Sequence, residues 1–322
     1  MSRQIRFGIL STAKIGRKYV IPALQKASLC EVSAIASRNL ERAQEAAGQF
    51  TIPKAYGSYE ELLGDPDLDA VYIPLPNHMH VPWTLKALEA GKHVLCEKPI
   101  AMNADEARHL KRETERYPNL RVMEAFMYRH HPRWKRVKEI VDSGMLGEIK
   151  AVHSFFSYFN ENPDDYRNSA DMGGGGLMDV GCYSVSVARL VYGRQPDRVF
   201  GASEMDPTFG TDRLTSGLLD FGSGTSVFTC STRCEKDQYV KIYGTTGMLT
   251  VEMPFNPDFS KKTHLHLRIE GKQSTESFDP CDHFTLQGDA FARAILENRP
   301  VPLSLDDSIG NMEVIDEVRK SA

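Results

Sequence analysis

The first 124 residues alternate short apolar runs with amphipathic ones, and this alternation limits the possible fold more than any other feature. The apolar runs predict strands over 5–10, 31–36, 69–74, 92–97 and 120–125. The amphipathic runs predict helices over 14–24, 40–50, 80–91 and 104–117. Strands that are apolar along their whole length are typical of a parallel sheet covered on both faces. The alternation therefore predicts a doubly wound α/β domain over residues 1–124.

The rhythm changes after residue 149, where strand-like runs follow one another. They occupy 149–159, 198–205, 215–221, 225–232, 239–244, 248–253 and 264–270. One long helix, predicted over 176–192, interrupts them, and Gly222 to Gly224 mark a hairpin between two of the strands. Strands without intervening helices favour a large open antiparallel sheet. Residues 125–322 are thus predicted to form an α+β domain, with the C-terminal helices free to pack back on the first domain.

Composition excludes several classes of protein. The chain has 322 residues, which suits about two domains. A formal net charge of −4 provides no basic surface, so nucleic acid is excluded as a partner. No apolar run approaches the roughly 18 residues of a membrane helix, and the N-terminus enters a strand without an apolar signal region. The six cysteines form no CxxC pair, so we expect reduced, buried thiols in a cytoplasmic protein and no metal site.

The turn after the first strand, GILSTAKIG at 8–16, is a variant of the dinucleotide-binding fingerprint. Three small residues normally provide the tight turn, the approach to pyrophosphate and the packing of helix on strand. Ser11, Ala13 and Gly16 occupy those places here. A helix beginning near Lys14 would point its N–H groups at a phosphate. The alternative is an ordinary tight turn, since small residues are common between a strand and a helix.

The end of the second strand, IASRNLERA, indicates which nicotinamide cofactor binds. NAD-binding sites usually have an acidic residue here for the ribose 2′-hydroxyl. This chain has Ser37 and Arg38, a hydroxyl and a guanidinium that suit a 2′-phosphate. Arg42, one helical turn further on, either assists or is a solvated helix residue. The sequence therefore predicts NADP in preference to NAD.

Two opposite charges and a proline follow the buried strand in GKHVLCEKP. Glu97, Lys98 and Pro99 lie at the carboxyl end of a predicted parallel strand, as does PLPNHMH at 74–80. Ligands of doubly wound sheets bind outside these ends. An arbitrary Glu–Lys pair is most often a surface ion pair. Here the rigid proline, in a cis or trans bond, fixes the chain direction, so Lys98 is a candidate proton-transfer or electrostatic group.

A glycine run opens the long helix of the second domain, in MGGGGLMDVGCYSVSVARLVYG at 172–193. Asp179 and Tyr183 are four residues apart, so an α-helix places them on one face. The glycines permit close approach of another backbone or of a ligand. The alternative is that Tyr183 is a core tyrosine and that Asp179 is an acid favoured in a first helical turn.

Taken in order, these motifs resemble the glucose–fructose oxidoreductase / inositol dehydrogenase / rhizopine catabolism (Gfo/Idh/MocA) family of NAD(P)-dependent oxidoreductases. The shared landmarks, spread over nearly the whole chain, are GILSTAKIG, PNHMH, HVLCEKP, EAFMYRHHP, GGGGLMDVGCY and GTTGML. The resemblance implies a Rossmann domain and an open sheet domain whose flat face forms a homodimer or a dimer of dimers. It also implies that Lys98, Asp179 and Tyr183 are the catalytic group and that Pro99 is cis. Many members have histidine in place of Tyr183; the tyrosine form is similar to NADP-dependent xylose dehydrogenases and dimeric dihydrodiol dehydrogenase.

The resemblance gives an expected set of cofactor contacts and an expected activity. The predicted contacts are Ser11, Thr12, Ala13, Lys14, Ile15, Ser37, Arg38, Arg42, Leu75, Asn77, His80, Glu97, Lys98 and Arg167. For Arg167, the alternative to a cofactor or substrate contact is that it is a surface loop residue. The expected activity is hydride transfer between NADP and a sugar or sugar-like alcohol. Three alternatives are a keto-sugar or dicarbonyl reductase, a trans-dihydrodiol dehydrogenase and a non-catalytic NADP-binding sensor.

Overall fold

A computed structural model describes residues 3–322, and their contacts divide the chain into two compact units, each built on one sheet. The segments of unit 1 are the chain up to His130 and Asp282–Ile309, and those of unit 2 are His131–Cys281 and Gly310–Ala322. A segment from near the C-terminus therefore belongs to the same unit as the N-terminal sheet.

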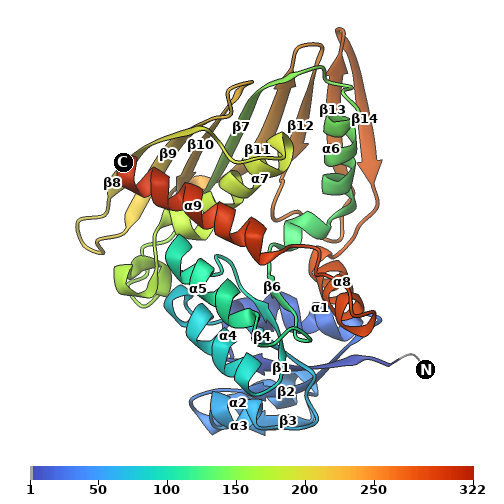
Figure 1. Cartoon of the computed structure of the whole chain (residues 1–322), viewed down its shortest axis with the longest axis vertical. Coiled ribbons are helices and arrows are strands. Elements are labelled where there is room, and N and C mark those ends of the chain that lie inside the picture. Colours follow the sequence, from blue (N-terminus) through green and yellow to red (C-terminus); the bar gives the residue numbers. More distant parts are fainter. Residues whose placement is uncertain (1–2) are drawn as a thin grey trace. The chain divides into compact units, whose positions relative to one another are not determined.

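The sheet of unit 1 has six parallel strands in the order β3-β2-β1-β4-β5-β6 (Figure 1). They are β1 (Ile5–Leu10), β2 (Cys30–Ala36), β3 (Lys54–Tyr56), β4 (Ala70–Ile73), β5 (His93–Cys96) and β6 (Val122–Glu124). This confirms the predicted parallel sheet, although the short strand β3 was not predicted. The strand order reverses between β1 and β4, which is where such sheets bind ligands.

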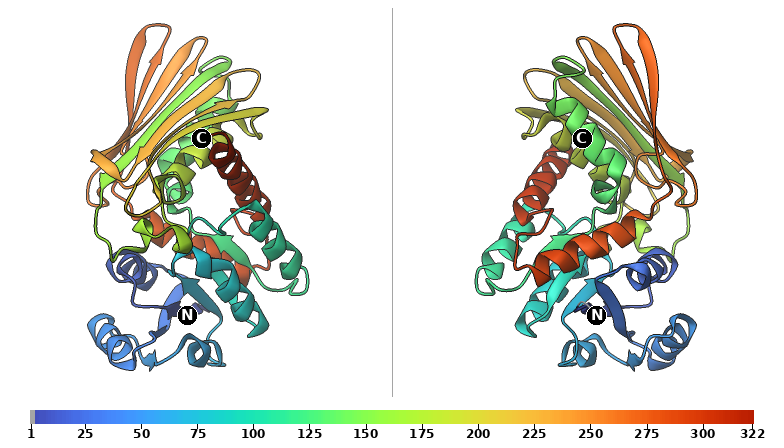
Figure 2. Two further views of the ribbon diagram at one scale, coloured as in Figure 1. Left: turned by 90° about the vertical axis from the view of Figure 1, so that its left-hand side faces the viewer. Right: turned by 90° about the vertical axis from the view of Figure 1, so that its right-hand side faces the viewer.

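Helices cover both faces of this sheet (Figure 2). They are η1 (Gly16–Val20), α1 (Ile21–Lys26), α2 (Leu40–Phe50), α3 (Tyr59–Leu63), η2 (Asn77–Met79), α4 (His80–Glu89), α5 (Ala104–Thr114), η3 (Met127–His130) and α8 (His283–Leu296). On one face the ring of Phe7 in β1 lies 6.2 Å from that of Phe291 in α8. On the other, a Cβ on the next residue, Gly8, would lie 2.6 Å from Leu62 of α3. The helix predicted over 14–24 contains the π-helical turn η1 and is therefore not uniformly α-helical.

The sheet of unit 2 has eight strands in the order β14-β13-β12-β11-β7-β10-β9-β8. They are β7 (Ile149–Phe159), β8 (Arg198–Met205), β9 (Asp212–Asp220), β10 (Thr225–Ser231), β11 (Arg233–Gly244), β12 (Gly247–Glu252), β13 (Thr263–Ile269) and β14 (Lys272–Phe278). Asp220 pairs with Thr225, which confirms the predicted hairpin. Within residues 3–322, β7 and β10 form the one parallel pair of this sheet, so the expected antiparallel sheet is mixed at that position.

The helices of unit 2 cover a single face of this sheet (Figure 2). They are α6 (Pro132–Asp142), η4 (Tyr166–Asn168), η5 (Ala170–Met172), η6 (Leu177–Gly181), α7 (Cys182–Tyr192) and the part of α9 (Leu305–Ser321) from Gly310 onward. Alternate residues of β7, among them Val152 and Phe156, are buried beneath these helices. The opposite face carries half-exposed side chains such as Phe200.

The helix predicted over 176–192 is continuous but not uniformly α-helical. Its first turn, η6, is π-helical, and the Cys182 N–H donates to the Leu177 carbonyl, five residues back. The remaining turns form α7. We refer to η6 and α7 together as the helix 177–192. A π-helical turn inside a helix is frequently found at functional sites.

Two expectations drawn from composition are also addressed by the structure. Among residues 3–322, every helix is too short or too polar to cross a membrane. Four cysteines are buried, as expected: Cys30, Cys96, Cys182 and Cys230. Cys234 and Cys281 are half-buried, contrary to that expectation.

Candidate active site

The turn after β1 has the backbone shape of a dinucleotide-binding turn without its usual glycine. Ser11 has a φ of +128°, a region that favours glycine and costs other residues about 1–3 kcal/mol. Its Oγ accepts a hydrogen bond from the Ala13 N–H at 3.2 Å, which steadies the turn. A Cβ on Gly16 would meet Pro74 and Tyr72 at 3.7 Å, so the helix packs closely on the sheet there. Of the other predicted contacts in this turn, Thr12 and Ile15 are half-buried and Lys14 is exposed.

The end of β2 presents positive charge. Ser37 is buried, and its Oγ accepts from the Asn39 N–H at 3.3 Å. Arg38 and Arg42 are both exposed. Burial raises the pKa of the nearby Tyr59 phenol, while the charge of Arg38 and its hydrogen bond oppose that shift. Arg38 follows the strand and Arg42 lies in the first turn of α2, and both are exposed groups of the kind that would receive a 2′-phosphate.

The Glu97–Lys98–Pro99 turn is held from several directions, and the Lys98–Pro99 bond is cis, as the resemblance implied. The Tyr72 hydroxyl donates to Glu97 Oε1 at 2.6 Å, and the Ile100 N–H donates to the buried Glu124 carboxylate at 2.8 Å. The Lys98 side chain is half-buried. Glu97 is thus tied into the sheet, and the turn is more than a surface ion pair.

His80 lies beneath this turn and is completely buried. Its Nδ1 is 2.7 Å from the Pro99 carbonyl and its Nε2 is 2.7 Å from the Leu75 carbonyl. Burial lowers the pKa of His80 to about 4, so the imidazole is neutral at pH 7 and donates from one nitrogen only. His80 joins the 74–80 turn to the turn at Pro99, and its predicted contact with the cofactor stays a prediction. Asn77 beside it is also buried, and its cofactor contact stays a prediction.

In unit 2, Asp179 is the centre of a hydrogen-bonded group. Its Oδ2 accepts a hydrogen bond from the Tyr158 hydroxyl at 2.6 Å and forms an ion pair with Arg167 Nε at 3.1 Å. Burial acts to lower the pKa of Arg167. The negative charge of Asp179, with smaller contributions from Tyr166, Tyr158 and Asp165, outweighs burial and raises that pKa well above its usual value. The Arg167 guanidinium also lies 4.6 Å from the centre of the Tyr166 ring. Arg167 is therefore part of the Asp179 group rather than a solvated surface residue.

Tyr183 lies in an aromatic cluster on the same side of β7. Its ring centroid is 5.6 Å from that of Phe156 and 5.0 Å from that of Phe255. Phe156 and Tyr158 are two residues apart on β7 and so project from the same face. Because one contacts Tyr183 and the other Asp179, the predicted sharing of one helix face is confirmed. The exposed fractions are 4% for Tyr183 and 8% for Asp179.

Three residues of this group were not predicted from the sequence: Tyr158, Phe156 and Phe255. The run FFSYF at 155–159 carries a period-two signal that places Phe156 and Tyr158 together. No signal of that kind reaches Phe255, which follows β12 and comes to Tyr183 only through the fold.

Each unit has its own chemical character. Unit 1 has strand-end turns and exposed arginines suited to a dinucleotide phosphate. Unit 2 has a carboxylate held by the Tyr158 hydroxyl and the Arg167 guanidinium, one helical turn before the Tyr183 phenol. Such groups can bind and deprotonate a hydroxyl. Within residues 3–322, no three His, Cys, Asp or Glu side chains are grouped so that they could hold a metal ion.

Two family models match the chain in succession. The first, described as "Oxidoreductase family, NAD-binding Rossmann fold", matches residues 5–126. The second, described as "GFO/IDH/MocA C-terminal domain", matches residues 134–250. Together they cover the sheet of unit 1 and much of the sheet of unit 2.

Similar proteins extend over the whole chain. A D-xylose 1-dehydrogenase (NADP(+)) from Haloferax volcanii is 43% identical, over 98% of this chain and 97% of its own. A trans-1,2-dihydrobenzene-1,2-diol dehydrogenase from Mus musculus is 31% identical, over 98% of this chain and 96% of its own. Among solved structures, a 3-ketoreductase from Actinomadura kijaniata in complex with NADP and TDP-benzene has a TM-score of 0.94 and 31% identity, covering 99% of this chain and 98% of that one.

Proposed function

Because the chain belongs to the Gfo/Idh/MocA family of NAD(P)-dependent oxidoreductases, we propose that it is an NADP-dependent dehydrogenase acting on a CH–OH group of a sugar or sugar-like alcohol. The observation that carries the proposal is the Asp179 group, in which Tyr158 and Arg167 hold a carboxylate one helical turn before Tyr183. Of the similar proteins above, the xylose dehydrogenase has the highest identity to this chain, which favours an aldose as substrate.

The residues of unit 1 fit NADP. Arg38 and Arg42 supply positive charge for the 2′-phosphate, and no carboxylate stands at the predicted ribose position to repel it. Ser11 and the four residues after it would take the pyrophosphate at the start of a helix. NADP, when bound, supplies the acceptor for the hydride.

The residues of this chain account for the proton. In the proposal, oxidation of the alcohol releases a hydride from carbon and a proton from oxygen, and Tyr183 takes the proton. The positive charge of Lys98 favours the phenolate form that can accept it. Asp179 orients the hydroxyl groups of the substrate through hydrogen bonds. In the reverse direction Tyr183 returns the proton to a carbonyl oxygen.

The proposal is tested by following the formation of NADPH with a panel of aldoses, including D-xylose, and of inositols. We expect turnover with at least one aldose and faster turnover with NADP than with NAD. Binding of NADP without turnover of any substrate would instead support the non-catalytic sensor.

Reduction is the second candidate activity, because the 3-ketoreductase structure matches this fold with a TM-score of 0.94. The same panel therefore includes keto-sugars, dicarbonyls and trans-dihydrodiols, with NADPH consumption measured for the carbonyl compounds. Turnover confined to keto-sugars or dicarbonyls would assign the chain as a reductase. Turnover confined to dihydrodiols would assign it to the activity of the mouse relative.

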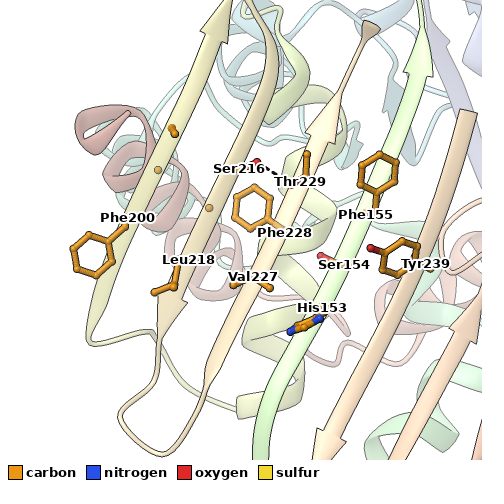
Figure 3. Close-up of a pocket in the computed structure, with 13 residues that line it drawn as sticks. His153, Ser154, Phe155, Phe200, Ser216, Leu218, Val227, Phe228, Thr229 and Tyr239 are labelled. Carbon is orange, nitrogen blue, oxygen red and sulfur yellow. Dashed lines mark hydrogen bonds between the residues drawn. The ribbon is translucent and has the colours of Figure 1, made fainter. Parts of the chain in front are cut away.

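We also propose that the chain self-associates through the open face of the unit 2 sheet. Its cytoplasmic location stays a prediction. Side chains on five neighbouring strands project from this face around a depression of about 440 Å³ (Figure 3). Phe200 is 50% exposed and Leu218 is 37% exposed. Their neighbours include Val227, Phe155 and Tyr239. The Ser216 and Thr229 hydroxyls form a hydrogen bond with each other at 2.8 Å, which satisfies part of their hydrogen-bonding capacity. A second copy would remove this apolar surface from water.

Sedimentation of the Leu218→Lys variant tests self-association. We expect the wild-type chain to sediment as a dimer or a dimer of dimers, and the charged variant to dissociate. A wild-type chain that sediments as a monomer at micromolar concentration would contradict this part of the proposal.

A further inference from the structure

The helix 177–192 starts against a carboxylate from a distant strand. Asp212, the first residue of β9, accepts the Leu177 N–H at 2.7 Å through Oδ2. The same oxygen accepts the Thr215 hydroxyl at 2.8 Å. The first N–H groups of a helix have no partner within the helix, and a carboxylate there also interacts favourably with the helix dipole. Asp212 therefore caps this helix from 35 residues further along the chain.

The glycine run makes room for this contact. A Cβ on Gly175 would lie 2.0 Å from Asp212 Oδ1, and Gly175 has a φ of +109°. A Cβ on Gly174 would lie 2.4 Å from the carbonyl of Arg167, the residue that holds Asp179. The close approach allowed by these glycines is thus to Asp212 and to the backbone at Arg167. The run brings the start of the helix and the Asp179 group together.

The same helix is fixed at a second place, after its π-helical turn. A Cβ on Gly181 would lie 2.8 Å from Cys230 Sγ, so the helix crosses β10 at close range there. The buried Asn311 donates from Nδ2 to the Cys182 carbonyl at 3.2 Å. Asp179 lies between the two fixed places, and Tyr183 directly follows the second.

The π-helical turn makes the starting position of the helix matter. Its five-residue hydrogen bond, from Cys182 to Leu177, inserts one residue relative to an α-helix. If the start of the helix were released, the turn could return to α-helical bonding. Asp179 would then rotate about the helix axis relative to Tyr183, by a large part of the angle between two successive residues. The contacts of Asp179 with Tyr158 and of Tyr183 with Phe156 would be strained, because both are made to the same strand.

We propose that Asp212 is a positioning residue of the active site. It holds the start of the helix 177–192, so that Asp179 and Tyr183 keep their contacts with β7. Its role is indirect, since it contacts the backbone of Leu177 and the hydroxyl of Thr215 rather than a catalytic side chain. The kinetic part of its test rests on the proposed function, whereas the structural part does not.

Asp282 provides a matched control in the other unit. It caps α8 by accepting the Phe284 N–H at 3.0 Å, so it makes the same kind of contact at the start of a helix. Burial raises the pKa of both carboxyls, Asp212 and Asp282. The helix that Asp282 caps carries none of the predicted catalytic or cofactor residues.

The experiment compares Asp212→Ala, Asp212→Asn and Asp282→Ala in the full chain. Misplacing a catalytic group by about 1 Å can cost about 100-fold. We expect Asp212→Ala to lower kcat by about 10- to 100-fold, with the Kd of NADP unchanged. Asparagine still offers an oxygen to Leu177, so Asp212→Asn should recover most of kcat. Asp282→Ala should lose thermal stability and keep kcat.

Hydrogen–deuterium exchange of the same variants gives a readout that needs no substrate. Asp212→Ala should speed exchange of the amides of residues 177–183, and Asp282→Ala should speed exchange only in α8. A wild-type chain without sugar turnover would refute the proposed function and leave this readout intact.

Two results would overturn the positioning role. One is unchanged exchange over residues 177–183 in Asp212→Ala together with a kcat within twofold of wild type. The other is an Asp212→Asn variant as slow as Asp212→Ala, because the Leu177 contact would then not explain the loss. If the alanine variant does not fold, Thr215→Val removes one donor to the same oxygen; we expect a two- to fivefold lower kcat, and no change would overturn the proposal.

Discussion

The two candidate half-sites are supported in different ways. In unit 1, the turn that carries Lys98 is held mainly through its backbone: the His80 side chain contacts the Pro99 carbonyl, and the Glu124 carboxylate accepts the Ile100 N–H. In unit 2, Asp179 is held by the side chains of Tyr158 and Arg167. A turn held through its backbone keeps its path when its own side chains change, whereas a site held through its side chains changes with the residues that supply them. Single substitutions should therefore alter the second half-site with little change to the chain path.

The largest effect is expected at Lys98. Replacing it by methionine keeps the side-chain length and removes the charge, so kcat should fall by about 10²–10⁴-fold while NADP still binds. Steady-state kinetics and NADPH fluorescence measure the two quantities. Lys86→Met is the control, because Lys86 forms a surface ion pair with Glu60 at 2.9 Å and such pairs contribute little. A Lys98→Met variant within twofold of wild type would end the catalytic assignment.

Tyr158→Phe tests whether side-chain support matters in unit 2. The variant removes the hydroxyl that donates to Asp179 and keeps the ring. A hydrogen bond to a charged group contributes about 1.5–3 kcal/mol, so kcat/KM should fall by about 10- to 100-fold. Tyr192→Phe is the matched control, because that hydroxyl donates to the Thr225 carbonyl at 3.0 Å on another part of the same unit. Equal, small effects of the two substitutions would mean that Tyr158 does not support Asp179 in catalysis.

Acid should weaken the backbone-supported half-site through His80. Its pKa of about 4 in the folded chain lies below the unfolded value of about 6.5, so the unfolded chain binds more protons between these values. Stability is therefore lost as pH falls below 6.5, by about 2 kcal/mol per such group between pH 7 and pH 4.5.

Urea unfolding at both pH values measures this loss. His80→Gln should unfold more easily at pH 7 but lose less stability on acidification than wild type. A His80→Gln variant with the full wild-type pH dependence would show that His80 is not the group responsible.

The smallest effect concerns the cofactor. Arg38→Ala should raise the Kd of NADP about tenfold and leave that of NAD nearly unchanged, because one charge-assisted contact to the 2′-phosphate is lost. Titration with both cofactors measures the difference. Equal losses for NADP and NAD would mean that Arg38 does not contact the 2′-phosphate.

Much of unit 1 was predictable because its signals are local. Strand β5 and the helix that precedes it follow from apolar periodicity, and Gly91, with a φ of +75°, marks the end of that helix. The three-residue strand β3 was missed because so short a run has no measurable period. Ser11 shows the limit of a motif: its positive φ fits the turn, but its residue type does not predict that φ.

Unit 2 was predictable in outline and not in its contacts. The strands β7 to β13 follow from the apolar runs, but the polar strand β14 was not predicted. The parallel pairing of β7 with β10 depends on how distant segments meet. The spacing of Asp179 and Tyr183 placed them on one face, whereas the π-helical turn between them has no sequence signature. Tyr158, Arg167 and Asp212 reach the helix from other segments, so their roles emerge only from the folded chain.

The central claim is that Tyr183 accepts the proton during oxidation, and the pH–rate profile of Tyr183→Phe at saturating NADP tests it most directly. In wild type the oxidation rate should rise with pH through one ionisation below the reference tyrosine value of about 10. Tyr183→Phe keeps the ring among Phe156 and Phe255, so it should fold normally, lose that rise and be slower by about 10²–10⁴-fold. A profile with the shape and height of wild type would show that Tyr183 is only a core tyrosine.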